Sequence, residues 1–164
     1  MRKIMTIAIA SLLTGLLTGC ATGNTAGKES NMRNRNLPAV PYQILKYGQV
    51  PADQREYMHG AHTYDVYHTD HAEEMAAFRE LYRKLSGEEA PQVAGTVIVA
   101  RYGTQRTGGY GFKVKEIADD GSTIKVVLAL QKPGDIATQA LTNPYIVILL
   151  PDIYREVEVV EVEG

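Results

Sequence analysis

One stretch of the 164-residue sequence constrains the fold more than any other: an apolar run that ends in a glycine-rich loop. Residues 97–100 are β-branched residues and an alanine, which is typical of a β-strand. The run breaks near Gly103, and the segment Thr107–Tyr110 (Thr-Gly-Gly-Tyr) then leads into a second strand pattern. Adjacent glycines adopt backbone conformations that other residues disfavour. The stretch therefore predicts a hairpin with a loop of specified shape.

Short strand patterns at close spacing fill most of the remaining chain. Strands are predicted at residues 42–47, 62–68, 96–102, 112–118, 123–130, 145–150 and 155–163. The nearly continuous apolar run at 96–102 predicts a central strand covered on both faces, and Asp119-Asp120-Gly121 predicts a hairpin turn rather than a calcium loop. In the last strand, the alternation of valine and glutamate slips at 159–160, which indicates a β-bulge or a switch of face.

One helix pattern follows the second strand. Asp70 and Glu73 have the spacing of a capping box, in which each side chain satisfies a backbone amide of the first turn. Apolar residues recur at helical spacing as far as Leu85, and Gly87 lies just beyond the end. These patterns predict a mainly β (α+β) fold: an antiparallel β-sandwich or barrel-like domain of about seven strands with one flanking amphipathic helix.

The first residues have a different character and predict a membrane anchor. Residues 1–19 contain two basic residues, a short apolar run and small residues before Cys20, the only cysteine. This arrangement resembles a bacterial lipoprotein signal peptide, which implies cleavage before Cys20 and acylation of that residue. Two or more acyl chains anchor a protein stably without a membrane span. We expect a signal peptide at 1–19, a lipidated cysteine and flexible tether at 20–37, and a β domain at 38–164.

Residue type and charge bear on location and partners. Ala21 rather than aspartate after the cysteine suggests, by resemblance to lipoproteins generally, sorting to the outer membrane if the cell has one. Removal of residues 1–19 leaves 145 residues with 15 basic and 19 acidic side chains, a net charge of −4. The basic residues are scattered and form no dense patch, so nucleic-acid binding is not expected. The sequence predicts a lipid-anchored protein of the bacterial envelope.

The glycine-rich loop is the predicted partner-binding site. Its residues Arg106, Thr107, Gly108, Gly109 and Tyr110 suit recognition better than bond-breaking, because no nucleophile and base accompany them. A purely structural role, in which the glycines form the turn and Thr107 bonds nearby backbone, is equally compatible with the sequence. No catalytic residue and no cofactor are predicted.

The histidines are the main alternative. All four, His59, His62, His68 and His71, lie within thirteen residues, and imidazole pairs bind zinc, copper or nickel, with Asp65 or Asp70 as candidate oxygen donors. Their two-residue gaps suit neither a strand face nor a helix turn well. We therefore favour surface histidines around a strand and a helix start, and predict no metal site.

Several motifs in order resemble a known family. Residues 97–103, the Thr-Gly-Gly-Tyr turn, an apolar strand, a connection through Pro133 and the segment Leu141–Tyr145 (Leu-Thr-Asn-Pro-Tyr) together are similar to the C-terminal domain of PrcB-type protease complex subunits. The resemblance covers roughly residues 42–158. It implies a non-catalytic lipoprotein subunit that associates with a surface protease complex and stabilises it.

Two other functions follow from the same residues. The loop also looks distantly like the Thr-Thr-Gly-Tyr loop of chagasin-type cysteine protease inhibitors, although Gln105-Arg106 stands where Asn-Pro is usual and no Arg-Pro-Trp loop exists. A protease inhibitor that uses Thr107–Tyr110 is therefore the first alternative. A periplasmic metal-binding protein built on the histidines is the second. The expected function remains a protein-binding or stabilising subunit rather than an enzyme.

Overall fold

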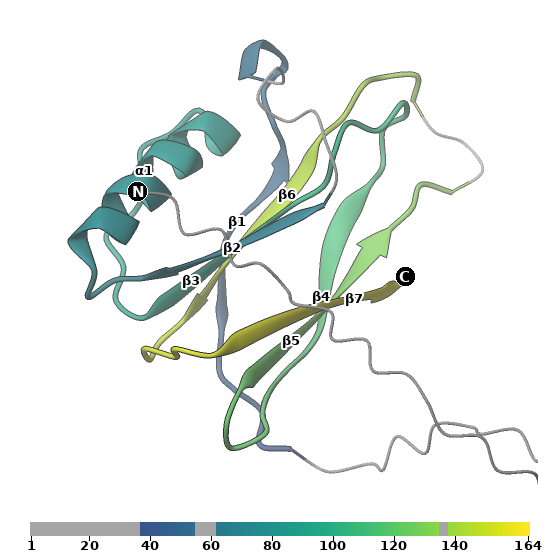
Figure 1. Cartoon of the computed structure of the whole chain (residues 1–164). Helices are drawn as coiled ribbons and strands as arrows, with labels where there is room; N and C mark the ends of the chain where they lie inside the picture. Colours follow the sequence, from purple (N-terminus) through teal and green to yellow (C-terminus); the bar gives the residue numbers. More distant parts are fainter. Residues whose placement is uncertain (1–36, 55–61, 135–137) are drawn as a thin grey trace, which may run out of the picture. The chain divides into compact units, whose positions relative to one another are not determined.

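The computed structural model describes residues 37–54, 62–134 and 138–164. Over these ranges the chain forms two packed β-sheets, with one α-helix on the outer face of the first sheet (Figure 1). The elements are β1 (Gln43–Gln49), β2 (Thr63–His68), α1 (Ala72–Ser86), β3 (Thr96–Arg101), β4 (Gly111–Asp119), β5 (Ile124–Gln131), β6 (Pro144–Leu150) and β7 (Val157–Glu163). The predicted mainly β fold with one flanking helix is confirmed. It is a sandwich, since the sheets do not close into a barrel.

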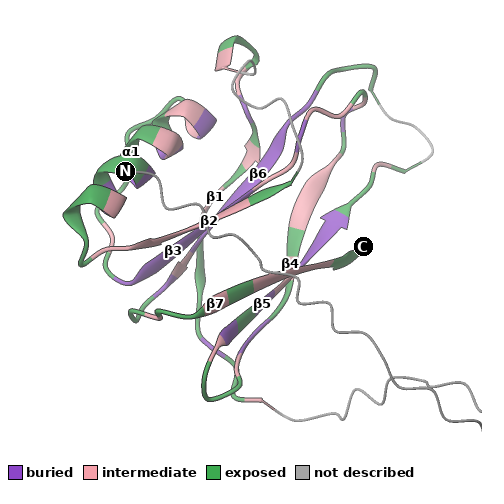
Figure 2. Cartoon of the chain, viewed as in Figure 1, coloured by how far each residue is buried: buried purple, intermediate pink, exposed green. Residues whose placement is uncertain are grey.

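The four-stranded sheet has the order β1-β6-β3-β2, and all its pairs are antiparallel. Its two inner strands, β3 and β6, are buried almost throughout (Figure 2). In β3, Ile98 and Ala100 face the second sheet, whereas Val97 and Val99 pack against α1. Both faces of the strand are covered, which is why its sequence is apolar without alternation. The predicted central strand is confirmed.

The three-stranded sheet has the order β4-β5-β7. Its first pair is the predicted hairpin: Gly121 has a φ of 92°, and the Asp120 carboxylate accepts the amides of Ser122 and Thr123 at 3.0 and 2.8 Å. The second pair, β5 with β7, is parallel. The expectation of a wholly antiparallel sandwich is therefore wrong at this pair. The chain crosses to the other sheet as β6 before it returns as β7, so no tight turn imposes an antiparallel direction.

The predicted hairpin between β3 and β4 is also wrong. The two strands belong to different sheets, and the loop between them crosses from one layer of the sandwich to the other. The physical reason lies in β3, whose two edges are already paired with β2 and β6. No edge of β3 remains for β4, although both strands and the glycine-rich loop lie where the sequence predicts them.

The helix begins one residue later than the predicted capping box. Its N-cap is His71, which makes no side-chain cap hydrogen bond, and the carboxylate that reaches back accepts the N–H of His68, at the end of β2, and belongs to Glu74 rather than Glu73. Asp70 instead pairs with Arg155. The predicted end is confirmed, because Gly87 has a φ of 73° and donates its N–H to the Arg83 carbonyl at 2.9 Å.

In β7 the valine pattern switches face while the backbone stays regular. Residues 157–163 pair with residues 124–130 without a register shift, so no bulge interrupts this pairing. Val157 and Val159 pack against the core between the sheets. Glu161 continues on their side, where its carboxylate accepts a hydrogen bond from the Tyr64 hydroxyl of the opposite sheet at 2.5 Å. The switch of face is the correct one of the two predicted alternatives.

Among the described residues, no helix has the length and apolar character needed to cross a bilayer. The predicted signal peptide at 1–19, Cys20 and His59 lie outside the described residues, as does the predicted tether apart from Leu37.

Candidate functional site

Residues 103–110, which we call the TGGY loop, pair with the segment just before β6. Gln105 and Thr142 exchange two backbone hydrogen bonds, of 2.7 and 2.9 Å. The Thr142 hydroxyl donates to the Thr107 carbonyl at 2.8 Å, and the Asn143 side-chain amide donates to the Thr104 hydroxyl at 2.9 Å. The two motifs on which the family resemblance rests therefore hold each other in place.

The two glycines of the loop lie where a side chain would not fit. Gly108 is buried and donates its N–H to the Thr138 carbonyl at 2.8 Å, and a Cβ atom on Gly108 would lie 2.2 Å from the Thr138 hydroxyl oxygen. Gly109 has a φ of 89°, and a Cβ atom there would lie 2.9 Å from the Pro133 Cβ. Both glycines are thus needed for the shape of the loop, as the structural interpretation of the sequence requires.

The five predicted partner-binding residues differ in accessibility. Arg106 and Gly109 are exposed, Thr107 and Tyr110 are half-buried, and Gly108 is buried. A partner that approaches the loop therefore meets the Arg106 side chain and the Gly109 backbone first. A hollow of about 420 Å³ adjoins the two glycines, and its lining residues are Gly108, Gly109, Gln131, Lys132, Pro133, Gly134 and Thr138.

An apolar surface that the sequence did not single out lies on β1 and the residue before it. Tyr42, Ile44 and Tyr47, which we call the β1 rim, are 44, 42 and 73% exposed. Ile44 and Tyr47 pair with Ile148 and Ile146 of β6, both of which belong to the core between the sheets. Paired residues of antiparallel strands point to the same face. Ile44 and Tyr47 therefore belong to the inner face of the sheet, at an edge where both side chains stay exposed.

The β1 rim continues toward the TGGY loop. Gln49, two residues beyond Tyr47, donates its side-chain amide to the Tyr110 carbonyl at 2.8 Å. Leu141 is 53% exposed and precedes Thr142, the residue that pairs with the loop. Tyr47 and Leu141 thus lie near the junction of β1, the loop and the start of β6, whereas Ile44 pairs nearer the other end of β6. The sequence predicts a strand at residues 42–47, but periodicity cannot tell which face of such a strand stays open.

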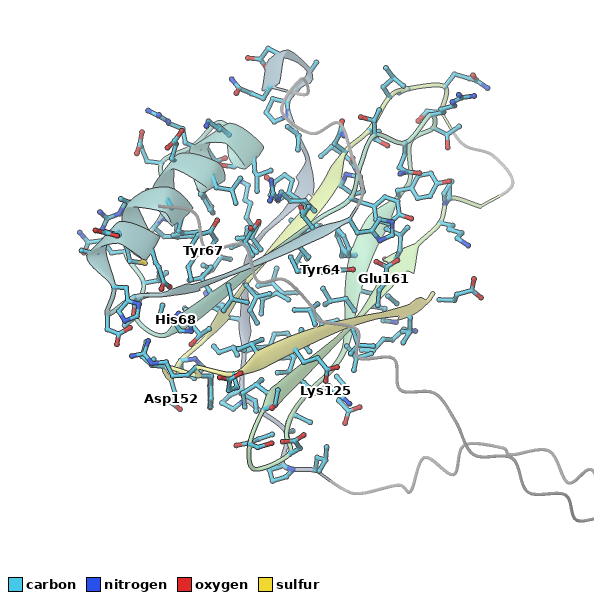
Figure 3. The ribbon with its side chains drawn as sticks, in the orientation of Figure 1. Tyr64, Tyr67, His68, Lys125, Asp152 and Glu161 are labelled. Carbon is cyan, nitrogen blue, oxygen red and sulfur yellow. The ribbon has the colours of Figure 1, made fainter. Side chains whose placement is uncertain are left out.

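The described histidines separate into two groups. His62 lies against Glu161, with its Nδ1 2.5 Å from a carboxylate oxygen, and its ring is 3.6 Å from that of Tyr102 between centroids. In Figure 3, Glu161 lies near Tyr64, whereas His68 lies apart from them, near the helix. Burial, together with the hydrogen bond to Glu161, raises the pKa of the Tyr64 hydroxyl. His68 and His71 lie instead at the beginning of α1 with Glu74.

The oxygen donors predicted for the histidines are occupied by arginines. Asp65 binds Arg101, and Asp70 binds Arg155. Glu74 takes their place: its Oε2 lies 2.8 Å from His68 Nδ1, and its Oε1 lies 2.7 Å from His71 Nδ1. Burial acts to raise the pKa of Glu74, but hydrogen bonds from His71 and His68 outweigh it and hold that pKa at about 2.

Comparison with known proteins identifies one part of the chain. Residues 96–151 match the family model described as PrcB C-terminal, which confirms the resemblance over that segment, about a third of the sequence. The segment runs from β3 through the TGGY loop, β4 and β5 to the end of β6, and so contains both paired motifs. No curated protein and no solved structure matches the chain.

Proposed function

We propose that this protein is a lipid-anchored, non-catalytic subunit of the bacterial envelope that binds and stabilises a protein partner, and that this partner is a surface protease complex. The observation that carries the proposal is the PrcB C-terminal match at residues 96–151, because the family name denotes a protease-complex subunit. The two serines of the described ranges have structural hydrogen bonds, which is compatible with an accessory role. The Ser86 hydroxyl donates to the Tyr82 carbonyl, and the Ser122 hydroxyl donates to the Asp120 carboxylate in the β4–β5 turn.

The β1 rim and Arg106 supply the contact surface in this proposal. Aromatic residues and arginine are enriched at protein interfaces, and exposed apolar side chains that cluster at one edge mark such surfaces more than scattered ones do. Thr107, Gly108 and Tyr110 serve mainly to hold the shape of the loop, because Gly108 is buried and the Thr107 carbonyl is already bonded. The TGGY loop then presents the exposed Arg106 side chain to the partner.

Membrane attachment through Cys20 is the second half of the proposal. Acylation of Cys20 anchors the chain, and residues 20–37 give the β domain reach from the outer membrane. A Cys20→Ser variant removes the acceptor sulfur. Mass spectrometry should then show loss of the lipid mass, and fractionation should move the protein out of the membrane pellet. A lipid mass retained in this variant would contradict the assignment of the anchor.

Affinity capture tests the partner. The tagged, lipidated chain is captured from gently solubilised envelopes of its own cells, and co-purifying proteins are identified and quantified. The proposal expects a protease complex in stoichiometric amount. Tyr47→Thr combined with Arg106→Ala should reduce its recovery several-fold, while Ile153→Thr, at a 36% exposed apolar position between β6 and β7, should not.

Two outcomes would contradict this proposal in different ways. Recovery of envelope background alone, from protein with an intact anchor, would refute the subunit role. Recovery of a complex that the double variant binds as well as wild type would keep the subunit role and refute the β1 rim and Arg106 as its contact surface.

A further inference from the structure

We propose that His68, His71 and Glu74 form a binding site for a divalent transition-metal ion, with zinc as the best match. The three residues lie in the turn after β2 and in the first turn of α1, and each offers one ligand atom within 4.8 Å of the others. This site was not predicted: the sequence favoured surface histidines, and Glu74 was not among the candidate oxygen donors. The inference does not rest on the proposed subunit function.

The tautomer of His68 is fixed by the backbone. Its Nε2 lies 2.9 Å from the Tyr154 carbonyl oxygen, which can only accept, so Nε2 carries a hydrogen. In the neutral imidazole, Nδ1 then presents a lone pair. A backbone carbonyl on the second ring nitrogen is the usual support of a metal-binding histidine, because it fixes both the orientation and the tautomer of the ring.

The lone pair on His68 Nδ1 points at a lone pair on an oxygen of the Glu74 carboxylate. His68 Nδ1 is 2.8 Å from Glu74 Oε2, a carboxylate oxygen that accepts. Two acceptors at this separation require a cation between them, either a proton on the imidazole or a metal ion. His71 Nδ1 lies 2.7 Å from the other oxygen of the same carboxylate. A metal ion can thus replace the protons between Glu74 and the two imidazoles, at a position that all three residues can reach.

The three ligand atoms are of the types that zinc binds. Two imidazole nitrogens and one carboxylate oxygen are the ligands of many zinc sites that keep a fourth position for water or a partner group. With metal–ligand bonds of about 2.0–2.1 Å, tetrahedral ligands stand about 3.3 Å apart. The present contacts of 2.8 and 2.7 Å go to different oxygens of Glu74, and the three ligand atoms, which lie within 4.8 Å of one another, move to this separation on binding. His71 is an exposed N-cap residue whose side chain can make that movement.

Two local charges oppose a cation, and one of them provides a test. The N-terminus of α1 carries partial positive charge, which Glu73 and Glu74 of the first turn offset. Arg155 is paired with Asp70, and its guanidinium lies 3.5 Å from His71 Nε2. A donor on Nε2 favours hydrogen on Nδ1, the atom that would bind the metal. Removal of the guanidinium should therefore strengthen metal binding.

The experiment is zinc titration by calorimetry on the full chain. The protein carries Cys20→Ser, so that a free thiol cannot contribute, and no histidine tag. We expect one zinc ion per chain, and cobalt should give the visible absorption of tetrahedral coordination. His71→Ala and Glu74→Gln should each weaken binding about tenfold or more, since even supporting residues change affinity by this factor. Arg155→Gln should tighten it.

His62→Ala is the matched control, because His62 belongs to the separate group with Glu161. Its affinity should equal that of the parent chain. Thermal unfolding of each variant without metal checks that the fold is intact. The proposal is overturned if zinc binds weakly and without 1:1 stoichiometry, if His71→Ala and Glu74→Gln bind zinc as the parent does, or if the loss follows His62→Ala. Protons would then be the cations that hold Glu74 between the two imidazoles.

Discussion

The TGGY loop and the β1 rim adjoin each other but use their residues in opposite ways. The loop has the motif that attracts attention in the sequence, yet backbone groups of Gln105, Thr107 and Gly108 are bonded inside the molecule, to Thr138 and Thr142. The rim has an ordinary strand sequence, yet it holds Tyr47, the most exposed large apolar side chain among the described residues, at 73%. A distinctive motif can thus serve the fold while an unremarkable strand faces the solvent. Apart from the exposed Arg106, substitutions should therefore change stability in the loop and partner binding at the rim.

The largest effect on stability is expected for Gly109→Ala. A φ of 89° is strained for alanine, and the new Cβ atom would lie 2.9 Å from the Pro133 Cβ. The free energy of unfolding should fall by about 2 kcal/mol, measured by chemical denaturation. Gly111→Ala is the control from the start of β4, because a Cβ atom there meets nothing within 4 Å. Equal effects of the two substitutions would contradict the strain argument.

A smaller loss is expected for Thr142→Val, which keeps the shape of the side chain and removes its hydroxyl. The Thr107 carbonyl loses its hydrogen bond from a buried residue, which should lower the free energy of unfolding by about 1 kcal/mol. Thr142→Ser retains the hydroxyl and should keep the TGGY loop in place. If the valine variant proves as stable as wild type, the bond between the two motifs contributes little to the fold.

Glu74 belongs to neither region, and its contribution to the free energy of unfolding can be measured separately because it depends on pH. A carboxyl group whose pKa is lower in the folded state stabilises that state at pH values above its unfolded pKa. Here the ordinary value is 4.5 and the folded value is about 2. The stability difference between wild type and Glu74→Gln should be complete near neutral pH and shrink between about pH 5 and pH 2. A difference that stays constant over this interval would contradict the low pKa.

The smallest effect on stability is expected at the rim. Tyr47→Thr keeps a residue that favours strands and removes an exposed ring, so the free energy of unfolding should stay within about 0.5 kcal/mol of wild type. Capture of the partner should fall in the same variant. A large loss of stability would show that the ring packs in the fold, and would make the rim a structural region like the loop.

Sequence reasoning succeeded where the signal is local. The Asp119-Asp120-Gly121 turn, the apolar stripe of α1 and the Gly87 cap each involve residues close in the chain, and the structure has them in the predicted places. The position of the glycine-rich loop was likewise predicted. Such features depend on backbone preferences that a few neighbouring residues determine.

The errors concern contacts between distant residues. The partners of β3 are a strand about thirty residues earlier and one about fifty residues later, so nothing near the TGGY loop reveals that β4 must pair elsewhere. His62 and Glu161 are 99 positions apart, and their contact separates the histidines into two groups. The capping error is local but small: Asp70 has the better cap chemistry, and its pairing with Arg155 of a distant segment takes it away from the helix.

The pairing of Gln105 with Thr142 has a consequence for how this fold can vary. This pairing joins the residues just before β4 and well after β5, so it closes the base of the segment that contains the β4–β5 hairpin. The turn at the other end of the hairpin can therefore change in length without moving Gln105 or Thr142. The turn at Asp120–Ser122 is exposed, and such turns accept inserted sequence readily. A tag, a fluorescent domain or a foreign epitope grafted there would report on the protein while leaving the β1 rim and the pairing of Gln105 with Thr142 in place.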